Sequence, residues 1–359
     1  MTSAPAPSNS ASAAAAPVHP DSRLAREVKV SATWARVART LAGVLAVAVV
    51  GNFLAMAYFR RWTANEGYWL IEQKWYRLMS LDKPVDWMLI GDSSCNQGLV
   101  PDVMSKRLGG EVQNFCVIGN MLALNGAWMV DAHIRRVGPP KHVVAMYVYD
   151  VWPRDPNPIL LAHVPLPWGY WSNAQPALSL SAVEQLKVAA ARYFPLFAQK
   201  KTIAFLAENP SRLWTQPAEL NANGFMVSAL PDTAYVLGDA KDHRAFVRGN
   251  HFQISEPNKR ALEHLIALAE QYHFDLYLVN GPSYEGLLRD EPFRAYYNDM
   301  RTALEGYSGR SRYVHYLSAP RPFPLAEMNS TDHVIFTAAQ RLTEQVSAEI
   351  AAARSGAQP

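Results

Sequence analysis

Strand-like and helix-like segments alternate along most of the chain, and this alternation limits the fold more than any other feature. Short apolar runs that indicate strands occupy residues 86–90, 112–118, 142–150, 275–280 and 313–317. Segments with apolar residues at helical spacing occupy residues 100–108, 121–138, 256–273, 291–305 and 335–352. Such alternation is typical of a parallel sheet with helices on both faces. We therefore expect a three-layer α/β/α domain over residues 85–355.

Residues 151–250 interrupt this alternation. They are rich in proline and aromatic residues and contain one clear helical pattern, at about 181–206. We interpret them as an insertion or cap between strand units. Its aromatic side chains either stack on a sugar or pack in the core; they include Trp152, Trp168, Tyr170 and Trp171.

A long uncharged stretch lies near the N-terminus. Thr40–Phe59 has no charge over 20 residues, which is about the length that a bilayer core requires. Arginines flank it on both sides, at positions 36, 39, 60 and 61. We predict a transmembrane anchor over residues 36–61, followed by a connecting helix over 62–84.

Two interpretations of this stretch stay open. As an uncleaved anchor, it follows a disordered cytoplasmic tail, residues 1–35, and the slight excess of basic residues before it places the C-terminal domain in the periplasm or outside the cell. As a signal peptide, it is cleaved after Ala55-Met56-Ala57. Membrane lipid is a partner only in the first case. A net charge of +3 without a dominant basic block gives no support for nucleic-acid binding.

Polar residues follow the predicted strands, where the carboxyl ends of parallel strands share one edge and ligands bind. Asp92, Ser93 and Ser94 come just after the first strand, and Gly119 and Asn120 come after the second. Asp150 is the last residue of the third strand and Asn280 of the fourth, and "NSTDH" (329–333) follows the last strand. The sequence therefore predicts a site at this edge of the sheet.

Ser93 is the candidate nucleophile of this site. A serine hydroxyl needs a base and preformed donors for the developing oxyanion. His333 is the candidate base, and the adjacent Asp332 could orient it. The candidate oxyanion donors are the backbone of Gly119 and the side chain of Asn280, with Asn120 as an alternative to Asn280.

Cys95 and Cys116 are the only cysteines, and they lie near the ends of two successive predicted strands. Without a CxxC pair or a Cys/His cluster we expect no metal site, and no motif indicates a cofactor. In an oxidising compartment the two cysteines could form a disulfide. Two buried thiols are equally compatible with the pattern, and Cys95 as a thiol nucleophile is a third possibility.

Three segments resemble sequence blocks of the SGNH (GDSL-type) hydrolase superfamily. "IGDSS" is similar to the first block, "NFCVIG" to the second and "STDHVIFTAAQRLTEQV" to the fifth. The resemblance implies a flavodoxin-like sheet with Ser93 as nucleophile, Gly119 as oxyanion donor and His333 as base. The chain departs from the pattern at Ser330, where the superfamily usually has Asp. It also departs after the third strand, where Asp150 stands in place of an Asn and an ionised carboxylate would repel an oxyanion.

The anchor and the insertion make the chain most similar to the membrane-anchored SGNH-like O-acyltransferases of exopolysaccharide and cell-wall modification. This resemblance implies transfer of an acetyl or other acyl group to a polysaccharide through a serine acyl-enzyme. It also implies a single-pass protein of the inner membrane that acts beside a multi-pass membrane-bound O-acyltransferase. One alternative is a secreted esterase released at Ala57. The two departures favour another alternative, a non-catalytic SGNH-fold assembly or polysaccharide-binding protein of an export or modification complex.

Overall fold

The computed structural model describes residues 21–62, 65–165, 180–214, 220–227 and 230–355. The chain forms two compact units, Met1–Ala57 and Tyr58–Pro359. Each unit is described by itself.

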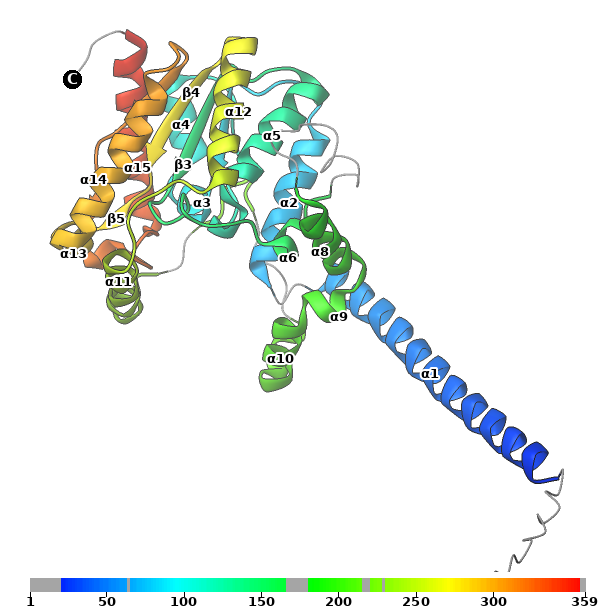
Figure 1. Cartoon of the computed structure of the whole chain (residues 1–359). Helices are drawn as coiled ribbons and strands as arrows, with labels where there is room; N and C mark the ends of the chain where they lie inside the picture. The colour runs from blue at the N-terminus through cyan, green and yellow to red at the C-terminus, as the bar shows by residue number, and fades with distance from the viewer. Residues whose placement is uncertain (1–20, 63–64, 166–179, 215–219, 228–229, 356–359) are drawn as a thin grey trace, which may run out of the picture. The chain divides into compact units, whose positions relative to one another are not determined.

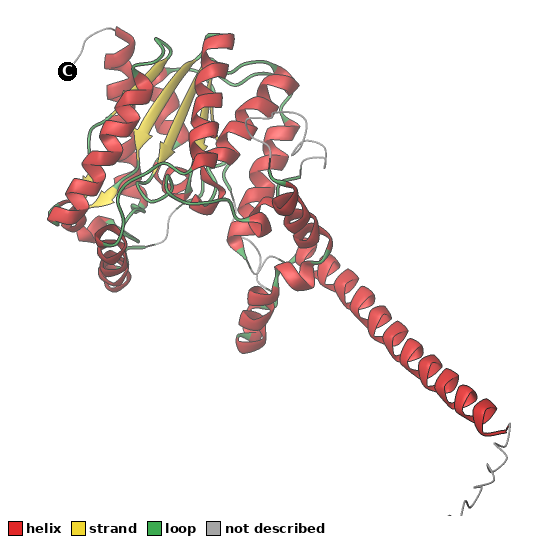
Figure 2. Ribbon diagram, in the orientation of Figure 1, coloured by secondary structure: helices red, strands yellow, loops and turns green. Residues whose placement is uncertain are grey.

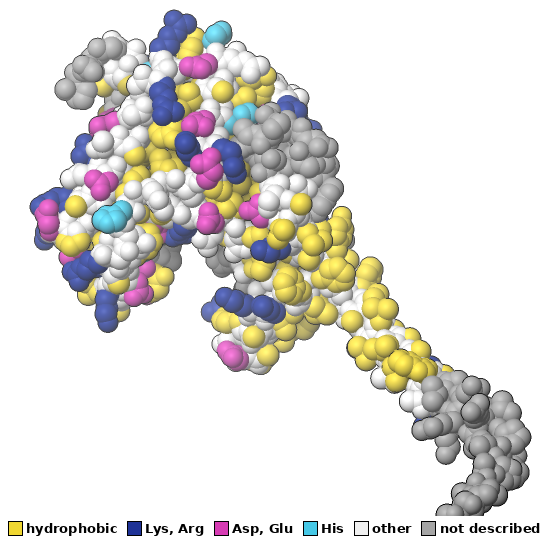
Figure 3. Space-filling view, in the orientation of Figure 1, with side chains coloured by type: hydrophobic (Ala, Val, Ile, Leu, Met, Phe, Trp, Pro, Cys, Tyr) yellow, Lys and Arg dark blue, Asp and Glu magenta, His cyan; other side chains and the backbone are white. Residues whose placement is uncertain are grey.

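The described part of the first unit is helical and belongs to α1, Asp21–Arg61. Its segment Thr33–Phe59 is long and apolar enough to cross a membrane, as a signal sequence near the N-terminus would also be. Figure 3 shows hydrophobic side chains along this helix. Helix α1 begins at Asp21, within the predicted tail 1–35, where residues 21–35 contain no proline or glycine and extending an existing helix is easier than starting one. The rest of the predicted tail, 1–20, lies outside the described residues.

The second unit contains a parallel five-stranded sheet with the order β2-β1-β3-β4-β6. The strands are β1 (Trp87–Gly91), β2 (Val112–Asn114), β3 (His142–Tyr147), β4 (Asp275–Asn280) and β6 (Val314–Leu317). This order confirms the expected flavodoxin-like sheet. A second, two-stranded sheet pairs β5 (Ser283–Tyr284) with β7 (Pro322–Phe323).

Helices cover both faces of the large sheet, so the three-layer architecture is also confirmed (Figures 1 and 2). One face packs against α5 (Leu122–Val137) and α12 (Glu256–Tyr272), and the other against α4 (Pro101–Leu108) and α15 (Phe336–Ser355). Alternate side chains of each strand enter the two cores, as the pleat requires. In β1, Met88 and Ile90 enter the first core, and Trp87 and Leu89 enter the second.

The predicted connecting helix is part of the folded unit. Helix α2, Glu66–Ser80, buries Ile71, Trp75 and Leu78 completely in the first core. Lys74 on the same helix is also fully buried, and its ammonium group donates to the side-chain oxygen of Asn96 (2.6 Å) and to the carbonyl oxygen of Gly224 (2.6 Å). The helix is therefore held by the domain over most of its length.

Two strands end earlier than the apolar runs predict. Strand β2 ends at Asn114, although the N–H groups of Phe115 (2.8 Å) and Val117 (3.0 Å) still donate to the carbonyls of Leu89 and Gly91 in β1. The N–H of Val148 donates to Asp92 Oδ2 (2.7 Å), which ends β3 at Tyr147.

The insertion is more helical than its sequence predicts. It contains α6 (Pro158–Leu161), α8 (Ala182–Tyr193), α9 (Pro195–Ala198), α10 (Lys200–Glu208) and α11 (Thr233–Arg248). The pattern at 181–206 is broken at Phe194 because a residue before proline disfavours the helical conformation.

The remaining helices lie after the insertion or at the end of β1. They are α13 (Glu285–Leu288), α14 (Glu291–Ser308) and α3 (Ser93–Gly98). Trp152 is buried and packs in the core, whereas Trp168, Tyr170 and Trp171 lie outside the described residues.

Candidate active site

Ser93 is the first residue of the short helix α3, directly after β1. Asp92 caps this helix, and its Oδ1 accepts from the N–H groups of Ser94 (2.9 Å) and Cys95 (3.4 Å). Ser94 and Cys95 are buried, whereas Ser93 is partly exposed. Of these three adjacent side chains, that of Ser93 is the one that solvent reaches.

The Asp92 carboxyl group is buried at the centre of this turn. Its Oδ1 also accepts from the Ser94 hydroxyl (2.5 Å), and its Oδ2 from the N–H of Val148. Burial raises the pKa of Asp92 to about 6, against the opposing effect of these two hydrogen bonds. The charge of Asp332 adds to the rise, and that of His333 opposes it. The residue before Ser93 therefore lies within electrostatic range of the predicted base and its partner.

Asp332 and His333 are neighbours in the sequence, and their side chains also contact each other. His333 Nδ1 lies 2.6 Å from Asp332 Oδ1. The Ser330 hydroxyl lies 2.6 Å from the same Nδ1 and donates to Asp332 Oδ1 (2.5 Å). Asp332 thus reaches the imidazole, and Ser330, three residues before His333, contacts both side chains.

The pKa values of this pair shift in opposite directions. Burial alone would lower the pKa of His333, but the charge and hydrogen bond of Asp332 outweigh it and raise that pKa. Burial alone would raise the pKa of Asp332, yet the charge of His333 and the hydrogen bonds from His333 and Ser330 hold it below its ordinary value. An imidazole whose Nδ1 faces a carboxylate keeps Nε2 for proton transfer.

The segments that carry Ser93 and His333 meet at the carboxyl edge of the sheet. Helix α15, which begins three residues after His333, packs against α3, which begins at Ser93. No hydrogen bond joins the Ser93 hydroxyl to His333 in the described part of the chain. Catalytic hydrogen bonds are often long without substrate. The pairing of these two residues therefore stays a prediction.

Gly119 lies beside the Asp92–Ser93 turn. It begins the 3₁₀ turn Gly119–Met121, and the first N–H groups of a helix have no partner within it. A Cβ atom on Gly119 would lie 3.8 Å from the Asp92 Cβ and 3.4 Å from the guanidinium group of Arg154. This position suits the predicted oxyanion donor.

Arg154, which the sequence analysis did not single out, compensates the charge of Asp150. Its guanidinium group pairs with Asp150 and donates to Asn120 Oδ1 (2.7 Å). Burial raises the pKa of Asp150, and Arg154 opposes the rise. The carboxylate that would repel an oxyanion next to Gly119 is thus paired with a cation.

Asn280 has its contacts on the side of β6. Its amide donates to the carbonyl of Ser318 (3.3 Å) and its Oδ1 accepts from the Tyr316 hydroxyl (2.9 Å). These contacts join the ends of β4 and β6 and do not favour the predicted oxyanion role. The amide of Asn120, held by Arg154 through its oxygen, has its nitrogen available beside Gly119.

Cys95 and Cys116 form a disulfide, with their Cα atoms 5.7 Å apart. This excludes the two alternatives that need a free thiol at these positions. The bond joins α3, two residues after Ser93, to the segment three residues before Gly119. The nucleophile turn and the oxyanion turn are therefore linked covalently.

A second acid–imidazole pair, which sequence reasoning missed, lies on α11. His243 Nε2 is 3.2 Å from Asp239 Oδ1, and His243 Nδ1 contacts the hydroxyl of the buried Tyr149. Asp239 Oδ2 accepts from both the N–H (3.0 Å) and the hydroxyl (2.6 Å) of Thr331. The insertion thus holds the loop that carries His333. Spacing of four residues on a helix is the signal that could have revealed the pair.

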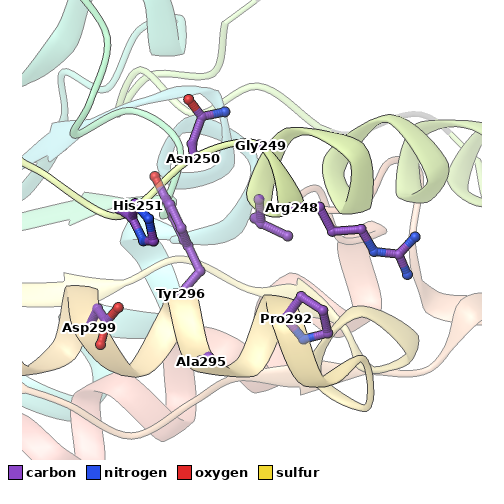
Figure 4. Close-up of a pocket in the computed structure, with 9 residues that line it drawn as sticks. Arg248, Gly249, Asn250, His251, Pro292, Ala295, Tyr296 and Asp299 are labelled. Atoms are coloured by element: carbon purple, nitrogen blue, oxygen red, sulfur yellow. The ribbon is translucent and has the colours of Figure 1, made fainter.

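One surface pocket lies away from these residues. A pocket of about 320 Å³ lies between the end of α11 and α14 (Figure 4). Its lining includes His251, Tyr296 and Asp299 and none of the predicted site residues. Within the described ranges, no group of three or more His, Cys, Asp or Glu side chains is arranged to hold a metal ion.

Comparison with known proteins finds no matching family model and no matching curated protein. Among solved structures, the chain is similar to one described as a candidate platelet activating factor from Streptococcus pneumonia, with 11% sequence identity and a TM-score of 0.34. The match covers 83% of this chain and 99% of that one. A likeness this distant supports no functional conclusion, so any function has to be argued from the geometry of the site.

Proposed function

We propose that the chain is a membrane-anchored SGNH-like serine acyltransferase or esterase that works through an acyl-enzyme on Ser93. The proposal is supported above all by the contact between Asp332 and His333 close to the capping residue of the Ser93 helix. This arrangement lies at the carboxyl edge of a parallel sheet, where such folds bind their ligands.

In the proposed mechanism, His333 Nε2 takes the proton of Ser93 while the hydroxyl oxygen bonds to the acyl carbon of the donor ester. The N–H groups of Ser93 and Gly119 are the proposed oxyanion donors, because the cap at Asp92 already occupies that of Ser94. The bond to the leaving oxygen then breaks, and the imidazolium returns its proton to that oxygen. A second hydroxyl attacks the acyl-enzyme in the reverse sequence of steps.

The proposed acceptor is a polysaccharide hydroxyl, and the proposed partner is a multi-pass membrane-bound O-acyltransferase that supplies the acyl group. Transfer exceeds hydrolysis only where the acceptor excludes water. The proposed role of the insertion, whose helix α11 contacts the His333 loop through Thr331, is to cover the acyl-enzyme against water as a cap.

A fluorophosphonate probe tests the nucleophile. The purified full chain should be labelled on the peptide that contains Ser93 and should release p-nitrophenol from p-nitrophenyl acetate. Ser93→Ala and His333→Ala should each reduce turnover by about 10²-fold or more. Ser105→Ala, which removes a half-buried hydroxyl on α4 that donates to the carbonyl of Gly110, is the matched control and should keep wild-type turnover.

Labelling that persists in Ser93→Ala would overturn the assignment. A folded wild-type chain that neither reacts with the probe nor hydrolyses the ester would favour the binding or assembly alternative instead. Circular dichroism of each variant separates loss of chemistry from loss of fold.

A further inference from the structure

The helices α8, α9 and α10 of the insertion carry many large apolar side chains on their solvent side. Leu186 is 69% exposed, Phe197 53% and Trp214, just beyond α10, 65%. Val183, Phe194 and Phe205 belong to the same surface and are also exposed. Figure 3 shows hydrophobic side chains gathered in this region, with Lys or Arg side chains beside them. We call this surface, α8–α10 with Trp214, the apolar insertion face.

Helix α8 is apolar on two opposite sides. Val188 and Ala191 are buried against the domain, whereas Val183 and Leu186 point away from it. An ordinary surface helix has one apolar stripe and a polar opposite face. A second apolar stripe in contact with water indicates that something else covers it.

Basic side chains border the apolar insertion face. Lys200 and Lys201 are exposed at the start of α10, and Lys200 lies over the ring of Phe197, with Nζ 5.6 Å from the ring centroid. Arg212 is exposed next to Trp214. Aromatic and apolar side chains mixed with lysine and arginine are the composition that binds a bilayer interface, where the cations meet anionic headgroups.

The apolar insertion face continues into the residues that end the apolar stretch of α1. The Tyr58 hydroxyl donates to the carbonyl of Leu213 (2.6 Å). The ring of Trp214 packs edge-on against Tyr58 and Trp62, with centroid distances of 6.4 Å and 5.5 Å. Tyr and Trp at the end of a membrane span mark the level of the headgroups. Trp214, which touches both of them, therefore belongs to the same level.

We infer that the apolar insertion face lies in the headgroup region of the bilayer that α1 spans. The inference rests on the anchoring that is part of the proposed function. A bilayer is favoured over a protein partner because the face is continuous with the aromatic end of the span and is bordered by cations. The insertion would then hold the domain at the membrane surface by contacts that the span alone does not supply.

Depth-dependent quenching tests this inference on the full chain. The two native cysteines are joined, so one introduced cysteine is the single reactive thiol. Leu186→Cys and Phe197→Cys are labelled with an environment-sensitive fluorophore and reconstituted in phosphatidylcholine–phosphatidylglycerol vesicles that contain doxyl lipids. Val47→Cys in the span is the positive control. Tyr272→Cys, at the exposed last residue of α12, is the negative control.

We expect quenching at positions 186 and 197 within roughly twofold of that at position 47, and none at position 272. If only position 47 is quenched, the anchoring holds but the inference is wrong, and a protein partner becomes the occupant of the face. If position 47 is not quenched either, the anchor itself is wrong and the inference falls with it. Ester hydrolysis by the labelled chains reports separately on the proposed chemistry.

Discussion

At the scale of single residues, the contact between Asp332 and His333 predicts how the rate depends on pH. The proposed base acts as neutral imidazole, so kcat/KM should rise with pH through the pKa of His333, which lies above its ordinary value. Asp332→Asn removes the charge that raises this pKa. The midpoint of the acidic limb should therefore move to lower pH, and the plateau should fall by roughly 10²-fold. Ester hydrolysis measured from pH 4 to 9 checks both effects, and an unchanged midpoint would show that the limb belongs to another group.

Gly91 predicts a second effect at this scale, on stability. A Cβ atom there would lie 2.1 Å from the carbonyl oxygen of Met146 and 2.7 Å from the Cβ of Cys95, and neither atom can move freely. Gly91→Ala should lower the free energy of unfolding by about 1–3 kcal/mol. Gly306→Ala in α14, with open space around the new methyl group, is the matched control and should raise it by roughly 0.5–1 kcal/mol. Denaturant titration of both variants measures the difference, and equal stabilities would contradict the close approach.

At the scale of elements, α11 of the insertion predicts a variant that lowers activity without touching the predicted catalytic residues. Asp239→Ala removes the acceptor for Thr331, two residues before His333. The loop should lose its position, so the rate of ester hydrolysis should fall by about 10-fold or more with little change in melting temperature. Asp242→Ala, an exposed carboxylate on the same helix, should leave the rate unchanged. Equal rates for the two variants would show that α11 does not position the loop.

The same elements show what the sequence could and could not predict. Period and composition predict every strand of the large sheet, because each is a short buried apolar run between helical patterns. The early end of β3 depends on the side chain of Asp92, whose partner Val148 is set by a tertiary contact. Helix α11 was missed because only a few of its residues face the core, so its apolar period is weak.

The candidate site, too, could be predicted from the sequence only in part. Ser93, Gly119 and His333 could be proposed from their places after strands and from the resemblance of their segments to known blocks. The spacing of four residues could have suggested the pairs Asp150–Arg154 and Asp239–His243. The contacts of Arg154 with Asn120 and of His243 with Tyr149, 34 and 94 residues away, could not be predicted from any local pattern.

At the scale of the whole molecule, the disulfide and the apolar helix together predict the side of the membrane on which the domain lies. Disulfides persist in oxidising compartments and are rare in the cytosol. The Cys95–Cys116 bond therefore agrees with the slight excess of basic residues before the span, which predicts a cytoplasmic N-terminus. Both observations favour an extracytoplasmic domain.

A thiol assay in cells tests this orientation. Cells that express the full chain are denatured in the presence of a maleimide–polyethylene glycol reagent, with and without prior reduction. An extracytoplasmic domain should be modified only after reduction, because both cysteines are joined. The double variant Cys95→Ser/Cys116→Ser should remain unmodified in both conditions and should lose about 3 kcal/mol of stability, the entropy of a loop closed across 21 residues. Modification of the native chain without reduction would place the domain in a reducing compartment. The proposed acyl transfer to an extracellular polysaccharide would then have no access to its acceptor, whatever the chemistry of Ser93.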